Sequence, residues 1–294
     1  RSPMGTVNIP LFMQTSIIDT TRDFPEENEM TQSSKPEYGS DLVVDLMRAA
    51  GIEYVAFNPG ATFRGLHDSL VNYAGNRRPE IILCTHEEIA VSIAHGYAKA
   101  KGKPMATVAH NVVGLQHASM AIFNAFCDQV PVLVLGGTGP MDTSKRRPWI
   151  DWIHTALVQG NLVRDYVKWD DQPASIDAVP EAFLRAWRIA QTEPQGPVYL
   201  CLDAPIQERK LERVIHLPDF ARFLPPAPPQ ADSRALEDAA RELVTMTRKR
   251  KINVVIGAGD FAKGRQGLQG VIDILAAITC PTILVPGNSE SYEE

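Results

Sequence analysis

Residues 81–104 read IILCTHEEIAVSIAHGYAKAKGKP, and this stretch decides the fold. Its first four residues, Ile81–Cys84, are apolar and predict a strand. From Glu87 onward, small and apolar residues recur at helical spacing up to Gly102-Lys103-Pro104, which predicts a helix. A strand that leads into a helix through Thr85-His86 places Glu87 at the carboxyl edge of a parallel sheet. That edge is where α/β proteins bind ligands.

Two interpretations of the acidic pair Glu87-Glu88 stay open on this pattern alone. Acidic residues are common in the first turn of a helix because they complement the positive end of its dipole. The pair is therefore either a helix-start signal or a working acid at a binding site.

Apolar segments alternate with helical patterns along the chain, and this order predicts the architecture. Several segments are continuously hydrophobic, which is typical of strands covered on both faces. We therefore predict an α/β fold, with a doubly wound, mainly parallel sheet and helices on both faces. A helix capped by Ser40 or Asp41 and ended by Gly51 precedes the sheet. The predicted strands are Tyr54–Phe57, Glu80–Cys84, Met105–His110, Val132–Gly136, Leu162–Val167 and Pro197–Leu202.

Four parts are expected in the chain. Residues 1–39 are polar and irregular and predict an N-terminal arm. Residues 40–217 form the α/β domain. The proline-rich segment 218–232 predicts a linker, because proline fixes the backbone and removes its donors. Residues 233–294 predict a helix, strand, helix, strand pattern, the incomplete beginning of a second α/β domain.

Composition excludes several classes of protein. The chain has 294 residues, 44% hydrophobic and 22% charged, which is globular composition. A formal net charge of -6 without a long basic run gives no electrostatic case for nucleic acid or membrane binding. No apolar segment reaches the roughly 18 to 20 residues of a membrane span. The four separated cysteines predict buried, reduced thiols, and we expect a cytoplasmic protein.

A family resemblance follows from three groups of residues. They are the segment His86–Pro104, the Asn58-Pro59-Gly60 turn after the first strand, and Gly114-Leu115-Gln116 with the run Ala125–Gly137. Together they resemble the pyrimidine-binding domain of thiamine-diphosphate-dependent enzymes, the acetolactate synthase and pyruvate oxidase group, from about Gly39 to about Pro205. Many relatives have Gly-Pro-Gly where this chain has Asn111-Val112-Val113-Gly114, so the substrate is not carried over.

The resemblance implies specific site residues. Glu87 takes the catalytic, cofactor-activating position, which Glu88 does not, and would hydrogen-bond a pyrimidine nitrogen of thiamine diphosphate. Asn58, Pro59, Gly60 and Gly114 join Glu87 in binding the cofactor. His110 and Gln116 are candidates for substrate contacts, although a strand-end histidine can equally serve the backbone. We expect no metal ligand in this chain.

The implied cofactors are thiamine diphosphate and Mg²⁺. The family holds the diphosphate and Mg²⁺ through a Gly-Asp-Gly motif followed by Asn on a separate domain, and these residues contain no such motif. The Mg²⁺ ligands are therefore expected outside this chain. Gly257-Ala258-Gly259 lacks the third glycine of a dinucleotide fingerprint and predicts a tight turn. FAD or a nucleotide stays an open alternative that these residues do not support.

The implied reaction is carbon-carbon bond cleavage or formation on a small 2-oxo acid. The chain would contribute the half of the site that carries Glu87 and would be inactive alone. We expect a homodimer or homotetramer, or a partner chain that carries the diphosphate-binding domain. Lys145–His154, rich in charge and indole, predicts an interface, the alternative being a loop with its tryptophans folded onto the domain. A fragment of a longer enzyme, one chain of a split enzyme and a non-catalytic or regulatory binding subunit stay open.

Overall fold

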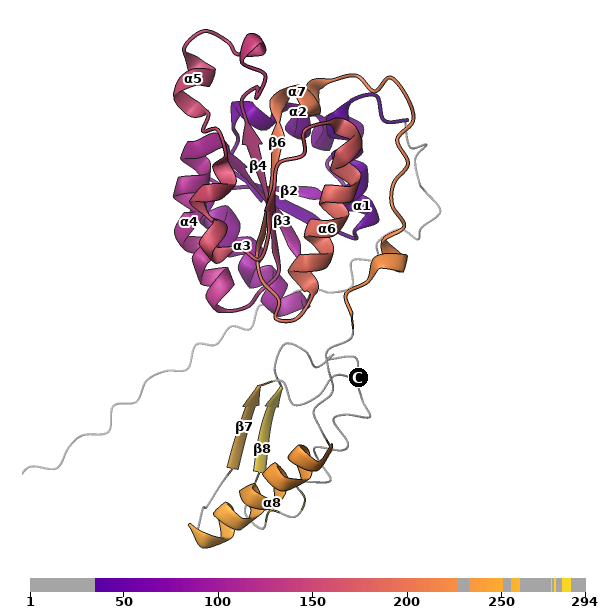
Figure 1. The fold of residues 1–294 in the computed structure, drawn as a ribbon. Helices are drawn as coiled ribbons and strands as arrows, with labels where there is room; N and C mark the ends of the chain where they lie inside the picture. Colours follow the sequence, from indigo (N-terminus) through magenta and orange to yellow (C-terminus); the bar gives the residue numbers. More distant parts are fainter. Residues whose placement is uncertain are drawn as a thin grey trace, which may run out of the picture. The chain divides into compact units, whose positions relative to one another are not determined.

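The computed structural model describes residues 35–226, 233–250, 255–259, 276, 278 and 282–286. Its main feature is a six-stranded sheet in the order β2-β1-β3-β4-β6-β5, in which every pair of neighbouring strands is parallel (Figure 1). The predicted α/β class is therefore confirmed. The strands are β1 Tyr54–Phe57, β2 Glu80–Leu83, β3 Met105–His110, β4 Val132–Thr138, β5 Asp170–Asp171 and β6 Val198–Asp203.

Helices connect these strands in the doubly wound manner. The α-helices of this part of the chain are α1 Gly39–Ala49, α2 Arg64–Asp68, α3 Glu87–Lys101, α4 Asn111–Cys127, α5 Ile150–His154, α6 Val179–Gln191 and α7 Ala204–Glu208. The short 3-10 turns are η1 Ala61–Phe63, η3 Thr143–Lys145, η4 Gln159–Leu162, η5 Arg164–Tyr166, η6 Ile176–Ala178 and η7 Phe220–Phe223, and η2 Ser69–Tyr73 is a π-helical turn after α2.

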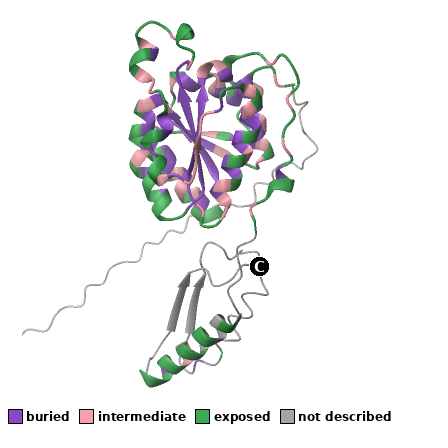
Figure 2. Cartoon of the chain, viewed as in Figure 1, coloured by how far each residue is buried: buried purple, intermediate pink, exposed green. Residues whose placement is uncertain are grey.

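Alternate residues of the central strands serve the two faces of the sheet. Leu133 and Leu135 of β4 pack in one core with α1 and α6, whereas Val132 and Val134 pack in a second core with α3 and α4. Figure 2 shows the strands buried between helices whose outer surfaces are exposed. Continuous hydrophobicity arises because both faces of each central strand are covered.

Two local predictions in this part of the chain are wrong. Leu162–Val167 forms parts of η4 and η5, and the strand that pairs with β6 is the short Asp170–Asp171. Ser40 and Asp41 do not cap α1, which begins at Gly39. Instead Asp41 lies inside its first turn, where the carboxylate accepts bonds from the backbone N–H groups of Glu37 and Tyr38. Helix α1 ends as expected, before Gly51 with φ of +72°.

The cysteines divide into two groups. Cys84 and Cys201 are buried, as predicted, but Cys127 is exposed at the end of α4. The prediction for Cys127 fails because the last turn of α4 presents that position to solvent. Cys280 lies outside the described residues. Among the described residues, none of the helices combines the length and apolar character needed to cross a membrane.

The remaining elements lie after residue 232. Helix α8 spans Ser233–Lys249, and β7 Val255–Gly259 pairs in parallel with β8 Thr282–Pro286. The expected turn at Gly257-Ala258-Gly259 is wrong, because these residues pair with Leu284, Val285 and Pro286 as part of a strand. The predicted arm up to residue 34, most of the proline-rich run and the expected helix 267–278 apart from residues 276 and 278 lie outside the described residues.

Candidate active site

The candidate site lies where the strand order of the sheet reverses. The chain passes from β1 to its neighbour β2, then returns to place β3 on the other side of β1. Such a switch point separates the loops that follow β1 and β3 and leaves a crevice at the carboxyl ends of the strands. The segments 58–62 and 110–114 begin at this edge, and Glu87 follows the end of β2.

Glu87 is the first residue of α3 and is only 4% exposed. The preceding residue His86 has extended backbone and caps the helix, its Nδ1 accepting the backbone N–H of Glu88 at 3.3 Å. Glu88 is exposed on the next position of the helix. The two acidic residues therefore differ in exposure, Glu87 being buried and Glu88 lying in solvent.

Each oxygen of the Glu87 carboxylate has its own neighbour. Asn58 Nδ2, from the end of β1, donates to Oε1 at 3.3 Å, and His117 Nδ1, from α4, lies 3.4 Å from Oε2. A methyl group at Gly114 would lie 3.0 Å from Oε1, so the absence of a side chain there leaves room for the carboxylate. The predicted residues Asn58, Glu87 and Gly114 are brought together.

The structure adds His117 to the predicted residues. Its ring stacks on that of His86, with the centroids 4.7 Å apart and the planes inclined by 19°. Sequence reasoning missed this residue although Gly114 and His117 are three positions apart on one helix, which places them on the same face. That spacing was the available signal. Gln116, the predicted neighbour, is exposed.

Another contact joins the segment 58–62 to His110 at the end of β3. Its Nδ1 lies 3.0 Å from Thr62 Oγ1, and a methyl group at Gly60 would lie 2.4 Å from its Cβ. Gly60 therefore permits close approach of the two loops, here to His110. Burial lowers the pKa of His110, and the neighbouring His154, 6.0 Å away between ring centroids, acts in the same direction. Pro59 is exposed.

His86, Glu87 and His117 also offer donor atoms that lie within 4.8 Å of one another, a set that suits a transition metal by ligand type. The ring geometry argues against that use. An imidazole directs its lone pair in the plane of its ring, and two stacked rings inclined by 19° cannot both aim at one ion. We therefore assign the three side chains, in this arrangement, to hydrogen bonding.

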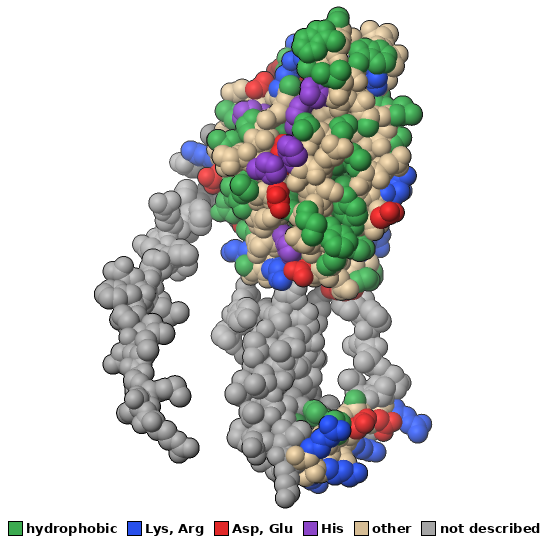
Figure 3. Space-filling model, turned by 90° about the vertical axis from the view of Figure 1, so that its left-hand side faces the viewer, with side chains coloured by type: hydrophobic (Ala, Val, Ile, Leu, Met, Phe, Trp, Pro, Cys, Tyr) green, Lys and Arg blue, Asp and Glu red, His purple; other side chains and the backbone are tan. Residues whose placement is uncertain are grey.

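Exposed hydrophobic side chains lie on the elements that carry the candidate site. Figure 3 shows a line of histidines on the side of the molecule that carries α4, with hydrophobic side chains around it. The exposed hydrophobic residues from the neighbouring elements are Leu83 of β2, Ile89 of α3, and Val113, Met120, Phe123 and Phe126 of α4. Trp149 and Trp152 are 71% and 56% exposed, so the tryptophans of Lys145–His154 are not folded onto the domain.

Comparison with known proteins gives a consistent result. Residues 38–162 match the family described as thiamine pyrophosphate enzyme, N-terminal TPP binding domain. The acetolactate synthase large subunit of Lactococcus lactis is 30% identical over 244 residues, which cover 83% of this chain and 39% of that protein. Acetolactate synthase 3 of Brassica napus, a chloroplastic protein, is 22% identical over 310 residues, covering 100% of this chain and 44% of that protein.

A solved structure shares the fold. Benzoylformate decarboxylase from Polynucleobacter necessarius aligns with a TM-score of 0.62 at 22% identity, over 85% of this chain and 44% of that one. At this identity the likeness concerns the fold alone. The chain spans less than half of the length of each of these three proteins.

Proposed function

We propose that this chain takes part in carbon-carbon bond cleavage or formation on 2-oxo acids, because residues 38–162 match the thiamine pyrophosphate enzyme family and an acetolactate synthase large subunit is 30% identical over 244 residues. The proposed activity is similar to that of an acetolactate synthase. Glu87 is the proposed catalytic residue, and the buried, oriented state of its carboxylate is the observation that carries the proposal.

The residues around Glu87 fit the pyrimidine end of the cofactor. Glu87 is only 4% exposed, and the missing side chain at Gly114 leaves room for its carboxylate. A flat, uncharged ring suits a buried partner position of this kind better than a charged group does, because burying a charge is costly. When bound, thiamine diphosphate supplies the carbon centre that adds to the 2-oxo acid carbonyl and delocalises the electrons released with carbon dioxide.

The protein groups orient Glu87 and keep water from it. Asn58 donates one bond to Oε1, and because a carboxylate oxygen has two lone pairs, that oxygen can still share a proton with a ring nitrogen. His117 holds Oε2, which fixes the plane of the carboxylate. Shielding from water strengthens a proton-sharing hydrogen bond at this position. Glu87 therefore holds or transfers one proton, and Asn58 and His117 are positioning residues.

The other predicted residues take supporting roles in this proposal. Gly60, packed against His110, and Pro59 would shape the turn under the cofactor. His110, bonded to Thr62 at the edge of the sheet, is available as a contact for the 2-oxo acid. Gln116 is exposed one position before His117 and would contact substrate only where another surface closes over it.

We propose that this chain provides half of the cofactor site. The diphosphate and Mg²⁺ are proposed to bind a domain outside these residues, since no Gly-Asp-Gly motif occurs among them. The exposed hydrophobic residues on α3 and α4 support cover by a second subunit, as a homodimer, a homotetramer or a complex with a partner chain. A non-catalytic or regulatory binding subunit is the alternative. Thiamine diphosphate titration in the presence of Mg²⁺ and a search for a copurifying chain separate these cases.

The experiment that tests the proposal replaces each acidic residue of the pair in the assembled enzyme. Glu87→Gln preserves shape but removes the titratable group, and Glu88→Gln makes the same change one residue away at an exposed position. We expect Glu87→Gln to lose nearly all turnover of pyruvate or longer 2-oxo acids and Glu88→Gln to keep it. Substantial turnover in Glu87→Gln, with thiamine diphosphate bound, would remove the basis of the proposal.

A further inference from the structure

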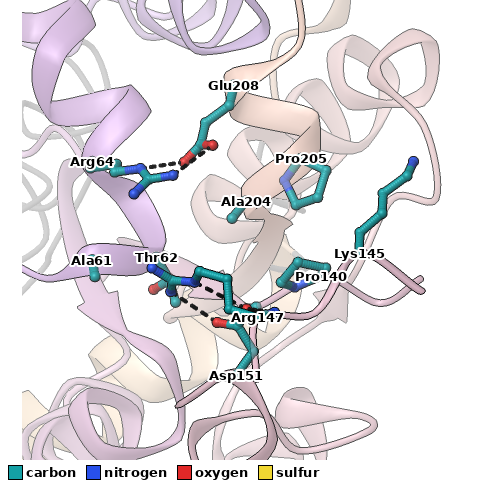
Figure 4. A pocket seen from close by; sticks show the side chains of 11 residues that line it. Ala61, Thr62, Arg64, Pro140, Lys145, Arg147, Asp151, Ala204, Pro205 and Glu208 are labelled. Carbon is teal, nitrogen blue, oxygen red and sulfur yellow. Dashed lines mark hydrogen bonds and ion pairs between the residues drawn. The ribbon is translucent and has the colours of Figure 1, made fainter. Parts of the chain in front are cut away.

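A cavity of about 150 Å³, lined by both charged and apolar residues, lies at the same edge of the sheet (Figure 4). Glu87, Asn58 and His117 do not line it, so it is distinct from the carboxylate site. Thr62 lines the cavity and bonds His110 at 3.0 Å, which links the cavity to the predicted substrate contact. The walls are Ala61, Thr62, Arg64, Gly139, Pro140, Lys145, Arg147, Asp151, Ala204, Pro205 and Glu208.

Two arginines enter the cavity, each held by a carboxylate. Arg64 bonds Glu208 through Nε at 2.7 Å and Nη2 at 3.0 Å. Arg147 bonds Asp151 through Nε at 3.2 Å and Nη2 at 2.9 Å. Both pairs use the same edge of the guanidinium group. Among the described residues, neither Nη1 atom has a hydrogen-bond partner, so each arginine keeps donors for a ligand.

The charges around the cavity do not cancel. Three cationic side chains, Arg64, Lys145 and Arg147, line it with two carboxylates, Asp151 and Glu208. The bond with Asp151 raises the pKa of Arg147, but the positive charge of Arg64 acts in the opposite direction. Both guanidinium groups line this one cavity, so their charges repel each other, and an anion between them would relieve that repulsion.

We propose that this cavity binds a small anionic group, a carboxylate or a phosphate, between the Nη1 atoms of Arg64 and Arg147. Arginine is well suited to planar anions because its donors are fixed in one plane. The volume is too small for a nucleotide, since sites for larger ligands enclose roughly 300 to 1,000 Å³. The anion is either the distal acidic group of a 2-oxo acid substrate or free phosphate. The first identity rests on the proposed function.

Calorimetric titration of the full chain with inorganic phosphate, succinate and acetate, without thiamine diphosphate, tests the site directly. We expect phosphate and succinate to bind more tightly than acetate. Arg64→Gln, whose ion pair is partly exposed, and Arg147→Gln should each weaken binding by roughly tenfold or more. Glu208→Gln should act in the opposite direction and tighten binding, because it removes a negative charge from the wall.

Arg164→Gln is the matched control. Arg164 makes the same two-bond pair with Asp170, at 2.9 and 2.7 Å, and its side chain is 54% exposed, against 50% for Arg147, but it does not line the cavity. We expect it to bind phosphate as the unaltered chain does. No saturable binding in the unaltered chain, or equal weakening by Arg164→Gln, would overturn the proposal. Circular dichroism confirms that each variant is folded.

The source of the anion is decided by turnover in the assembled enzyme. If the anion belongs to the substrate, Arg64→Gln raises KM for dicarboxylic 2-oxo acids and leaves KM for pyruvate unchanged. An unchanged ratio of the two KM values, with phosphate binding still lost, identifies free phosphate and overturns the substrate assignment. Because the titration uses no cofactor, failure of the Glu87 proposal would not affect its result.

Discussion

Gly114→Ala is the most informative single change at this site. The added methyl group would lie 3.0 Å from Glu87 Oε1, 3.3 Å from Glu87 Cγ and 3.2 Å from the backbone carbon of Ala109. Since part of this contact is with backbone, the strain cannot be relieved by the side chain alone. Overpacking of this kind costs about 1 to 3 kcal/mol. Replacing a helical glycine by alanine contributes about 1 kcal/mol in the other direction.

Gly96→Ala separates these two effects. Gly96 lies inside α3, and a methyl group there would have no neighbour within 4 Å, so only the helix contribution remains. We expect Gly96→Ala to stabilise the chain by about 1 kcal/mol in urea unfolding. Gly114→Ala should be less stable than Gly96→Ala by the overpacking cost, about 1 to 3 kcal/mol.

The cofactor measurement completes this prediction. In Gly114→Ala the carboxylate of Glu87 must move away from the methyl group, and its bond with Asn58 is already long at 3.3 Å. Losing the orientation of a charged hydrogen-bonding group costs about 1.5 to 3 kcal/mol, so thiamine diphosphate should bind the assembled enzyme at least about tenfold more weakly. The reasoning is refuted if Gly114→Ala matches Gly96→Ala in both stability and cofactor affinity.

Two further predictions concern titratable groups of the described domain. Burial and His154 lower the pKa of His110 in the folded chain, whereas the unfolded chain keeps the ordinary value of about 6.5. Neutral His110 therefore contributes stability at neutral pH, and this contribution is lost as the pH falls below about 6.5. The urea midpoint of His110→Gln should therefore fall less steeply than that of the unaltered chain between about pH 7.5 and 5.5, and identical slopes would contradict this. Burial raises the pKa of Cys201 to about 12 and also raises that of Cys84. Of the three described cysteines, a thiol reagent followed by peptide mapping should therefore label Cys127 in the native protein, and Cys84 and Cys201 only after unfolding. Labelling of native Cys201 at the rate of Cys127 would be the opposite result.

The parts of the fold that could be predicted are those in which local signals agree with tertiary packing. Residues 81–104 combine an apolar strand, a helical period and a terminal glycine, and β2 and α3 form there. The strand predicted at Leu162–Val167 is wrong because its two buried valines, Val163 and Val167, lie at the ends of a 3-10 turn and not in a strand. Burial alone does not distinguish these structures. The short strand β5, two aspartates, has no strand signal in its composition and forms because β6 offers a free edge.

The candidate site was predictable in part. Glu87, Asn58 and Gly114 lie at the ends of predicted elements, and their meeting follows from the parallel sheet. The contacts of His117 with Glu87 and of His110 with Thr62 depend on how α4 and η1 are seated, which a single sequence does not specify. The cavity could not be predicted because its two arginines are 83 positions apart and Glu208, the partner of Arg64, lies on a third segment.

The two walls of the cavity have unequal freedom to change during evolution. Thr62 is buried and in contact with His110, so a replacement there would also disturb His110 at the end of β3. Lys145 and Arg147 are about half exposed, at 52% and 50%, on the segment after β4. A mutant library designed to alter substrate preference would therefore target residues 143–151, because substitutions there leave Glu87 and its neighbours unchanged.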